Sequence, residues 1–175
     1  QEVTALARAK QLLLAEAIWT RYMPSRLMID QLLKEGLIGK PHMLTGNLAY
    51  KIDHIHRIQQ PSLAGGALLD VGVYPINFAS MVFGNDIIKI DSSVQMMPTG
   101  VDRQESMTFQ YADGRMAVLC ASASCIGDRQ GIVYGDQGTL IVDNVNNPQK
   151  ITVTSFLNGE EEVRTIDVPP QITGY

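Results

Sequence analysis

Three turn sequences in the second half of the chain constrain its fold more than any other feature. Each lies between two runs rich in apolar and β-branched residues, and the three are Ala112-Asp113-Gly114, Gly135-Asp136-Gln137-Gly138 and Asn158-Gly159. Asp-Gly and Asn-Gly pairs between such runs are strong hairpin signals, because tight turns need residues that adopt positive φ. The pattern predicts antiparallel strand pairs at residues 103–111 with 115–124, 130–134 with 139–143, and 150–156 with 162–168.

Two helices are expected before these hairpins. Residues 26–35 have helical apolar spacing after a break at Pro24, and Ser25 can cap them. Residues 67–83 form the second helix, which opens at the pair Gly65-Gly66. Two further strands are expected at residues 43–52 and 87–96. Helices followed by hairpins predict an α+β fold with an open, mainly antiparallel sheet and helices packed on one face.

The first seventeen residues have a sequence pattern that sets them apart from the rest of the chain. Residues 1–10 have a helical pattern, and the apolar run at residues 12–17 suits a buried strand. A helix that feeds directly into an apolar strand is typical of the end of a repeating α/β unit. We therefore expect residues 1–17 to be the remnant of the last helix and strand of a larger domain. Residues 18–175 then form a second, α+β domain, which we expect to be truncated because Gly174-Tyr175 is no evident terminator.

Composition excludes several classes of protein. The chain is 45% hydrophobic and 18% charged, which is ordinary for a soluble globular protein. A formal net charge of −4 argues against a nucleic-acid binder, which would normally show a basic face. No run of 18 uninterrupted apolar residues occurs, so we expect no membrane span.

The cysteines and histidines carry weak signals. Cys120 and Cys125 are expected to be reduced, buried thiols of a cytoplasmic protein. His54 and His56 flank Ile55 and would share one face of a strand. An H-x-H pair alone is a poor metal signal, so no metal site is predicted.

The segment Gly65–Tyr74 carries the strongest candidate chemistry. Asp70 and Tyr74 are four residues apart, so both side chains lie on one face of an otherwise apolar helix. Burying either group unpaired would be costly, so they either satisfy each other or face a cleft. A phenol releases its proton poorly near neutrality and needs a nearby cation or relay to act as an acid. From these residues alone, an ordinary helix-start aspartate and a half-buried tyrosine remain the more conservative interpretation.

Two other segments offer ligand contacts. Trp19 and Arg21 lie at an expected strand exit, where an aromatic ring and a cation suit a small polar ligand. A packed tryptophan in an ordinary linker fits equally well. The polar loop at residues 51–60 could contact hydroxyl or carboxylate groups, although a solvated loop is the simpler interpretation. Its candidate residues are His54, His56 and Arg57.

Four stretches of the chain occur in the order found in one known family. They are Glu16–Pro24, Leu37–Gly39, Gly65–Pro75 and Tyr134–Leu140. In this combination the chain resembles the C-terminal domain of the Gfo/Idh/MocA oxidoreductases, and Gly65–Pro75 is the most specific stretch. Trp19-Thr20-Arg21-Tyr22 together with Tyr74 resembles the dihydrodiol and xylose dehydrogenase branch, because the inositol dehydrogenase branch has His at the position of Tyr74.

The resemblance implies a complete protein of two domains. In the family, an N-terminal Rossmann domain holds NAD or NADP, and a lysine in a Glu-Lys-Pro motif contributes to catalysis. No G-x-G-x-x-G occurs in this sequence, and the lysine motif would lie just before Gln1. Residues 1–17 would then be the last helix and strand of that Rossmann domain. The resemblance also implies that this chain alone does not transfer hydride.

Roles for the candidate residues follow from the same resemblance. Tyr74 would donate or accept the proton of the reacting oxygen, and Asp70 would hydrogen-bond the substrate or support the lysine. Trp19 and Arg21 would border both the nicotinamide and the substrate. The substrate would be a sugar, a polyol or a related hydroxyl or carbonyl compound. Further substrate contacts would come from His54, His56 and Arg57.

Two other functions fit the same fold. The chain could be a non-catalytic sugar-binding relative, which keeps the sheet and loses the chemistry. It could also be an oligomerisation module, because in this family the uncovered face of the sheet often joins subunits. The apolar alternation over residues 115–124 fits such a covered face. We expect a homodimer or homotetramer through the open face.

Overall fold

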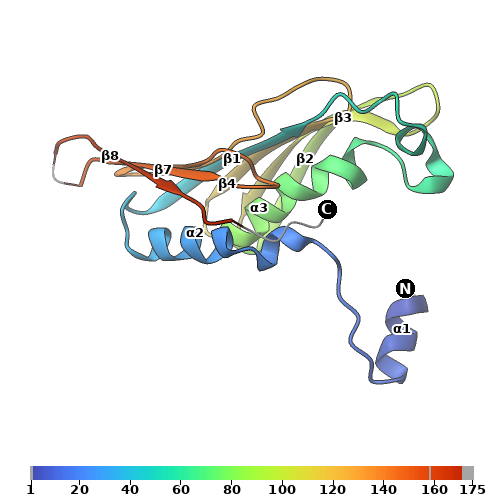
Figure 1. The fold of residues 1–175 in the computed structure, drawn as a ribbon, viewed down its shortest axis with the longest axis horizontal. Helices are drawn as coiled ribbons and strands as arrows, with labels where there is room; N and C mark the ends of the chain where they lie inside the picture. Colours follow the sequence, from blue (N-terminus) through green and yellow to red (C-terminus); the bar gives the residue numbers. More distant parts are fainter. Residues whose placement is uncertain (1, 158, 171–175) are drawn as a thin grey trace.

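The chain builds an open sheet of eight strands in a computed structural model that describes residues 2–157 and 159–170 (Figure 1). The order across the sheet is β2-β3-β4-β1-β5-β6-β7-β8. The strands are β1 (Pro41–Ala49), β2 (Ile87–Met96), β3 (Asp102–Tyr111), β4 (Met116–Ser122), β5 (Gly131–Gly135), β6 (Gly138–Val142), β7 (Lys150–Ser155) and β8 (Glu162–Asp167). β1 and β4 are parallel, and the other neighbouring pairs are antiparallel. The predicted fold class is confirmed.

The expected hairpins are present as β3–β4, β5–β6 and β7–β8. In the first, Gly114 has φ of 88°, and the Asp113 carboxylate accepts a hydrogen bond of 3.2 Å from the backbone N–H of Arg115. Glycine adopts this left-handed backbone without steric cost, which is why the Asp-Gly signal was informative. In the third hairpin, Gly159 also has positive φ, while Asn158 lies outside the described residues.

Two helices, α2 (Pro24–Lys34) and α3 (Val73–Phe83), cover one face of this sheet, whereas α1 (Glu2–Ala9) stands apart from it (Figure 1). The remaining helical elements are the short 3₁₀ turns η1 (Trp19–Tyr22), η2 (His56–Gln59) and η3 (Pro61–Leu63) and the π-helical turn η4 (Leu68–Gly72). α2 and α3 lie on the same side of the sheet (Figure 1), and both contribute buried side chains to one core. The π-turn η4 runs directly into α3. The helix predicted at residues 67–83 therefore consists of a π-helical turn followed by an α-helix.

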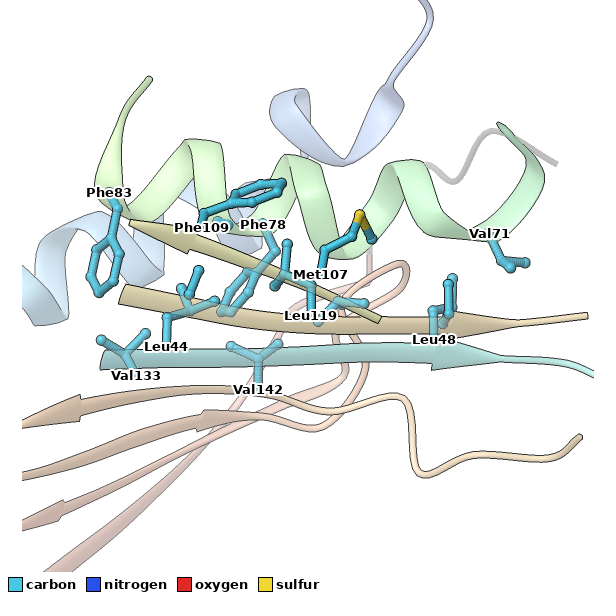
Figure 2. Close-up of a cluster of buried hydrophobic side chains, with 14 of the residues drawn as sticks. Leu44, Leu48, Val71, Phe78, Phe83, Met107, Phe109, Leu119, Val133 and Val142 are labelled. Atoms are coloured by element: carbon cyan, nitrogen blue, oxygen red, sulfur yellow. The ribbon is translucent and has the colours of Figure 1, made fainter. Parts of the chain in front are cut away.

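The core lies between α3 and the centre of the sheet. Figure 2 shows Phe78 on α3 pointing towards the strands that carry Leu44 and Leu119, each at most 1% exposed. A Cβ at Gly131 would lie 2.5 Å from the Phe78 ring, so glycine there makes room for the aromatic side chain. Along β4 the buried and exposed positions alternate, which leaves the far face of the sheet with Val118 and its outward neighbours exposed.

The helical stretch Pro61–Phe83 is long and apolar enough to cross a membrane, by length and composition alone. Half of its most apolar window is buried inside the protein, including Phe78 and Phe83. Packing against the sheet therefore accounts for its composition.

The expected strand at residues 12–17 is wrong. The segment after α1 has no strand, and Leu13 is 95% exposed. Among the described residues no strand pairs with it, so its backbone has no ladder to join. Trp19 consequently begins the 3₁₀ turn η1 and does not leave a strand.

Two local predictions also need correction. Ser25 does not cap α2, because the helix already begins at Pro24, whose fixed φ suits the first helical position, and Met23 is the N-cap. Cys120 and Cys125 are exposed where buried thiols were predicted. Cys120 follows the inward-facing Leu119 on β4, so the strand period of two turns it to the uncovered face.

Candidate functional site

A cavity of about 580 Å³ lies between the segment before η1 and the helix formed by η4 and α3. It brings together three of the predicted site residues, Arg21, Asp70 and Tyr74. Its complete lining is Glu16, Ala17, Ile18, Arg21, Leu69, Asp70, Val73, Tyr74, Ile76, Asn77, Ser80, Asn85, Ile87 and Phe109. A mainly apolar wall with a few convergent polar groups is typical of a small-molecule site.

Tyr74 lies in the first turn of α3 and is held by Trp19. The indole Nε1–H of Trp19 donates a hydrogen bond of 3.1 Å to the Tyr74 hydroxyl oxygen. The two rings also meet edge to face, with centroids 6.3 Å apart and an interplanar angle of 75°. Because a phenol can accept one hydrogen bond and still donate another, this contact leaves the Tyr74 proton available to a ligand.

Asp70 lies on η4, and its partner comes from a distant loop. Arg57, on η2, donates to Asp70 Oδ1, and the two side chains are 51% and 21% exposed. Asp70 and Tyr74 therefore do not satisfy each other; both face the cavity, which was the second of the two predicted alternatives. An inserted residue widens the helix at η4, and such π-turns occur frequently at functional sites.

Arg21 is fixed at the cavity wall by α3. Its Nη2 donates a hydrogen bond of 2.7 Å to the Ser80 hydroxyl, which itself donates to Asn85 Oδ1 at 2.6 Å. Further into the core, the buried Asn77 amide donates a hydrogen bond of 2.8 Å to Thr20 Oγ1. These contacts bind η1 to α3, so Trp19 and Arg21 keep a constant position relative to Tyr74.

His54 and His56 do not join this cavity. His54 lines a separate hollow of about 400 Å³ with Asp53, Gln59, Met97, Pro98, Thr99 and Arg103. His56 begins η2 and is exposed, so the two histidines are not on a strand and do not share a face. Among residues 2–157 and 159–170, no three His, Cys, Asp or Glu side chains gather in a group that could hold a metal ion.

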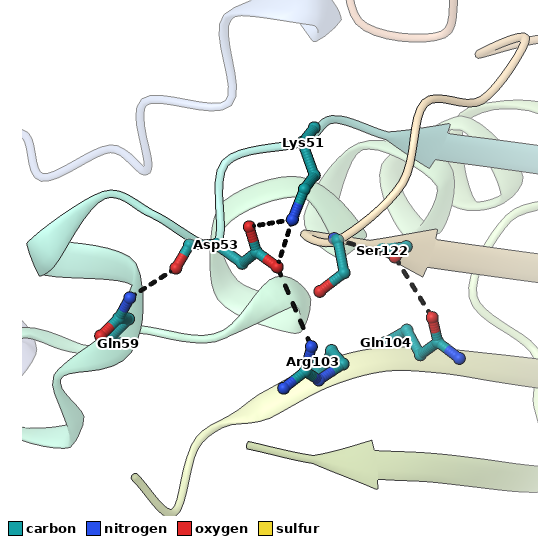
Figure 3. Close-up of polar contacts among 7 residues, drawn as sticks. Lys51, Asp53, Gln59, Arg103, Gln104 and Ser122 are labelled. Carbon is teal, nitrogen blue, oxygen red and sulfur yellow. Dashed lines mark hydrogen bonds and ion pairs between the residues drawn. The ribbon is translucent and has the colours of Figure 1, made fainter. Parts of the chain in front are cut away.

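The loop that carries Arg57 is clamped by an ionic cluster (Figure 3). Lys51 Nζ contacts both carboxylate oxygens of Asp53 at 2.6 and 2.8 Å, and Arg103 Nη1 lies 3.9 Å from Asp53 Oδ2. The hydrogen bond from Lys51 holds the pKa of Asp53 below its usual value. Gln59 Nε2 also donates to the Asp53 carbonyl at 2.6 Å. The segment is therefore an ordered support for Arg57, where a solvated loop was the simpler prediction.

Sequence analysis missed the polar residues that follow Tyr74 on α3. Asn77 and Ser80 continue the line begun by Asp70 and Tyr74, at helical spacings of three and four residues. This polar stripe along an otherwise apolar helix was a readable signal, because polar groups on a core helix must find a partner or a cavity.

The chain thus combines an open, mainly antiparallel sheet, helices on one face, and a phenol and a carboxylate that line a cavity beside them. The family model described as the GFO/IDH/MocA C-terminal domain matches residues 27–141. The chain belongs to this family of oxidoreductases.

Named relatives agree with this assignment. Trans-1,2-dihydrobenzene-1,2-diol dehydrogenase of Mus musculus is 31% identical over 175 residues, which cover 99% of this chain and 50% of that protein. The enzyme of the same name from Xenopus tropicalis is 33% identical over 171 residues, covering 97% and 50%. The chain thus spans about half the length of these relatives.

Solved structures share the fold. KijD10, a 3-ketoreductase from Actinomadura kijaniata in complex with NADP and TDP-benzene, has a TM-score of 0.84 at 22% identity, covering 95% of this chain and 53% of that one. An NAD binding oxidoreductase from Klebsiella pneumoniae has a TM-score of 0.79 at 21% identity, covering 96% and 50%.

Proposed function

We propose that this chain is the substrate-side domain of an NAD(P)-dependent oxidoreductase that acts on CH–OH groups, with Tyr74 as the proton donor and acceptor. The observation that carries the proposal is the Tyr74 hydroxyl, which is held by the Trp19 indole at the wall of a cavity that Asp70 also lines. A proton-transfer group must stand within hydrogen-bond reach of the reacting oxygen in a fixed orientation. The contact with Trp19 supplies that orientation.

The direction of proton transfer follows from the chemistry of the substrate. During oxidation, Tyr74 takes the hydroxyl proton of the substrate as the carbonyl forms; during reduction, it returns a proton to the carbonyl oxygen. The Trp19 N–H stabilises the tyrosine oxygen when it carries negative charge, because an N–H donor to an anion is stronger than to a neutral oxygen. The cationic Arg21 side chain lines the same cavity and also favours negative charge on the Tyr74 oxygen.

Asp70 and Arg57 suit a second hydroxyl group next to the reacting one. The Asp70 carboxylate accepts hydrogen bonds, and Arg57 donates to it and fixes its rotamer. A vicinal diol could donate one hydroxyl to Asp70 while the other meets Tyr74. The relatives named trans-1,2-dihydrobenzene-1,2-diol dehydrogenase support this class, which also includes sugars and polyols.

The cavity wall also fits a flat nicotinamide ring. Ile18, Val73 and Ile76 give an apolar surface beside Arg21, and Trp19 stands behind Tyr74. When bound, NAD or NADP supplies or takes up the hydride. The chain's own residues would hold the substrate oxygen and shield the reacting carbon from water.

A nucleotide-binding domain joined to residues 1–17 is part of the proposal. Helix α1 has no buried residue, and the following segment exposes Leu12, Leu13 and Leu14. Apolar side chains exposed in series mark a contact surface. A domain packed here would cover them and also close the cavity, whose wall includes Glu16 and Ala17.

We also propose that two or four copies associate through the uncovered face of the sheet. At its centre, Val118 lies between Thr45 on β1 and Thr108 on β3 and is 41% exposed, and Met43 and Met116 are 39% exposed beside it. Apolar side chains at the centre of this face suit sheet-on-sheet packing, and the exposed Lys89–Asp91 ion pair on β2 lies at its edge.

A substrate panel tests the proposed function on the full-length protein. We expect NAD(P)-dependent oxidation of trans-vicinal diols and pentose or hexose sugars, measured by nicotinamide absorbance, and slower turnover of matched mono-alcohols that lack the second hydroxyl. Cofactor binding without turnover of any diol, sugar or polyol would instead identify a non-catalytic sugar-binding relative.

A further inference from the structure

Glu105 on β3 is a buried carboxyl group that no hydrogen-bond donor satisfies. The side chain is 8% exposed, neither Oε1 nor Oε2 meets a donor among the described residues, and the neighbouring acidic group is Asp102. It points to the helix-covered side, because the neighbouring Val94 on β2 and Ala121 on β4 are its cross-strand partners and Ala121 is buried there. A buried, unpaired polar group is costly, so its retention needs a physical reason.

The reason lies in the π-turn directly above it. A Cβ added at Gly72, the last residue of η4, would lie 2.6 Å from Glu105 Oε1, so the carboxyl occupies the space that a side chain there would need. At the other end of the turn, the backbone N–H of Leu68 donates to Asp102 Oδ2. Two carboxyl groups of β3 therefore support the first and last residues of η4, the turn on which Asp70 lies.

We propose that Glu105 is a positioning residue for the candidate site: its side chain, packed beneath Gly72, sets the height of η4 over the sheet and so fixes Asp70 and Tyr74 at the cavity wall. The effect of Glu105 on catalysis rests on the proposed function, whereas the effect of Glu105 on the position of Tyr74 does not. Glu105 does not line the cavity that holds Asp70 and Tyr74, although it borders a separate hollow of about 520 Å³, so it acts on the site through Gly72 and the turn.

The surroundings keep this carboxyl protonated near neutrality. Burial, followed by the negative charge of Asp102 and the hydrogen bond that a protonated Glu105 can donate to it, raises the pKa of Glu105 to about 8. Among residues 2–157 and 159–170, Glu105 forms no ion pair with a cation: its β2 and β4 partners are Val94 and Ala121, and the acidic residue of η4, Asp70, is already paired with Arg57. The nearest titratable side chain of β4, Cys120, is turned to the opposite face.

Ionisation of Glu105 would therefore place a second negative charge beside Asp102 beneath one turn. Like charges this close repel, and a buried carboxylate draws water or moves towards solvent. Either response lifts η4 and displaces Tyr74 from Trp19.

Trp19 gives a direct readout of that displacement. It is the only tryptophan of the chain, and its indole N–H donates to the Tyr74 hydroxyl at 3.1 Å. The indole ¹H–¹⁵N resonance of the 175-residue chain is therefore a single signal that reports the Trp19–Tyr74 contact. No cofactor or turnover is needed, so the result is independent of the proposed enzymatic activity.

We expect the wild-type indole resonance to move with a midpoint near the Glu105 pKa of about 8. Glu105→Gln, which imitates the neutral carboxyl, should hold the resonance at its low-pH wild-type position throughout. Glu105→Ala should shift it even at low pH, because the support under Gly72 is lost. A wild-type resonance that does not titrate near this pH, a Glu105→Gln variant that titrates as the wild type does, or a Glu105→Ala variant with an unmoved signal would each overturn the proposal.

Discussion

At the scale of single residues, the site depends on partners that come from separate elements. Tyr74 is held by Trp19 of η1, and Asp70 is held by Arg57 of η2. The direction of each functional side chain is therefore set by contacts that are distant in sequence. Removing one partner should disturb function more than stability, because these contacts lie at the rim of the core.

Arg57→Ala tests this separation. Arg57 is half exposed, so we expect the free energy of unfolding to change by less than about 1 kcal/mol. Asp70 loses its orienting cation, and kcat/KM for a diol substrate should fall by about tenfold, which corresponds to roughly 1.4 kcal/mol. Steady-state kinetics of the full-length protein and urea unfolding measure the two effects. Arg164→Ala, which removes an arginine of similar exposure together with its ion pair with Glu162 on β8, is the control. Equal kinetic losses in both variants would contradict the role of Arg57.

Sequence analysis predicted seven site residues, and the structure brings five of them, Asp70, Tyr74, Trp19, Arg21 and Arg57, to one place, where each lines the cavity or contacts a residue that does. It could not predict Glu105, because nothing in the local pattern distinguishes it from the polar residues of an ordinary strand. Its burial depends on Gly72, which lies 33 residues earlier in the sequence and approaches only through the tertiary fold. Sequence analysis also grouped His54 and His56 with Arg57 because the three lie in one loop. In the structure, His54 lines a separate hollow and His56 is exposed.

At the scale of elements, α3 is both the core helix and the support of the site. Phe78 and Phe83 anchor it to the sheet, while Tyr74, Asn77 and Ser80 face η1 or the cavity. Strands and hairpins were predictable, because alternation and Asp-Gly or Asn-Gly turns are local signals. The strand expected at residues 12–17 failed because an apolar run becomes a strand only when another strand lies beside it.

Phe78→Ala should destabilise the chain by about 3–5 kcal/mol, because it removes a large buried side chain and leaves a cavity between α3 and the sheet. Phe78 is 1% exposed, whereas Phe156 is 45% exposed, so Phe156→Ala is a matched control with a much smaller expected loss. Urea unfolding monitored by circular dichroism measures both. Similar losses in the two variants would show that α3 is not the principal anchor of the core.

At the scale of the whole molecule, the two faces of the sheet differ in what covers them. Helices cover one face, and the other presents Met43, Met116 and Val118 in neighbouring strands. That uncovered face is the surface through which we propose that copies associate.

Val118→Arg tests the assembly. A buried charge in the centre of a sheet-on-sheet interface is strongly unfavourable, so we expect the variant to sediment as a monomer while the wild type sediments as a dimer or tetramer. Leu27→Arg, on the exposed side of α2 at 72% exposure, should leave the assembly unchanged. Sedimentation velocity at matched concentrations gives the result. If Val118→Arg and the wild type have the same mass, the interface lies elsewhere.

The role of Tyr74 is tested most directly by kcat of the Tyr74→Phe variant in the full-length protein with NAD(P) and a diol substrate. Loss of the proton-transfer group should lower kcat by about 10²–10⁴-fold while the affinity for the cofactor stays within a factor of about two. Tyr50→Phe, which removes a hydroxyl outside the cavity, should keep wild-type turnover. Wild-type kcat in Tyr74→Phe would contradict the proposed chemistry.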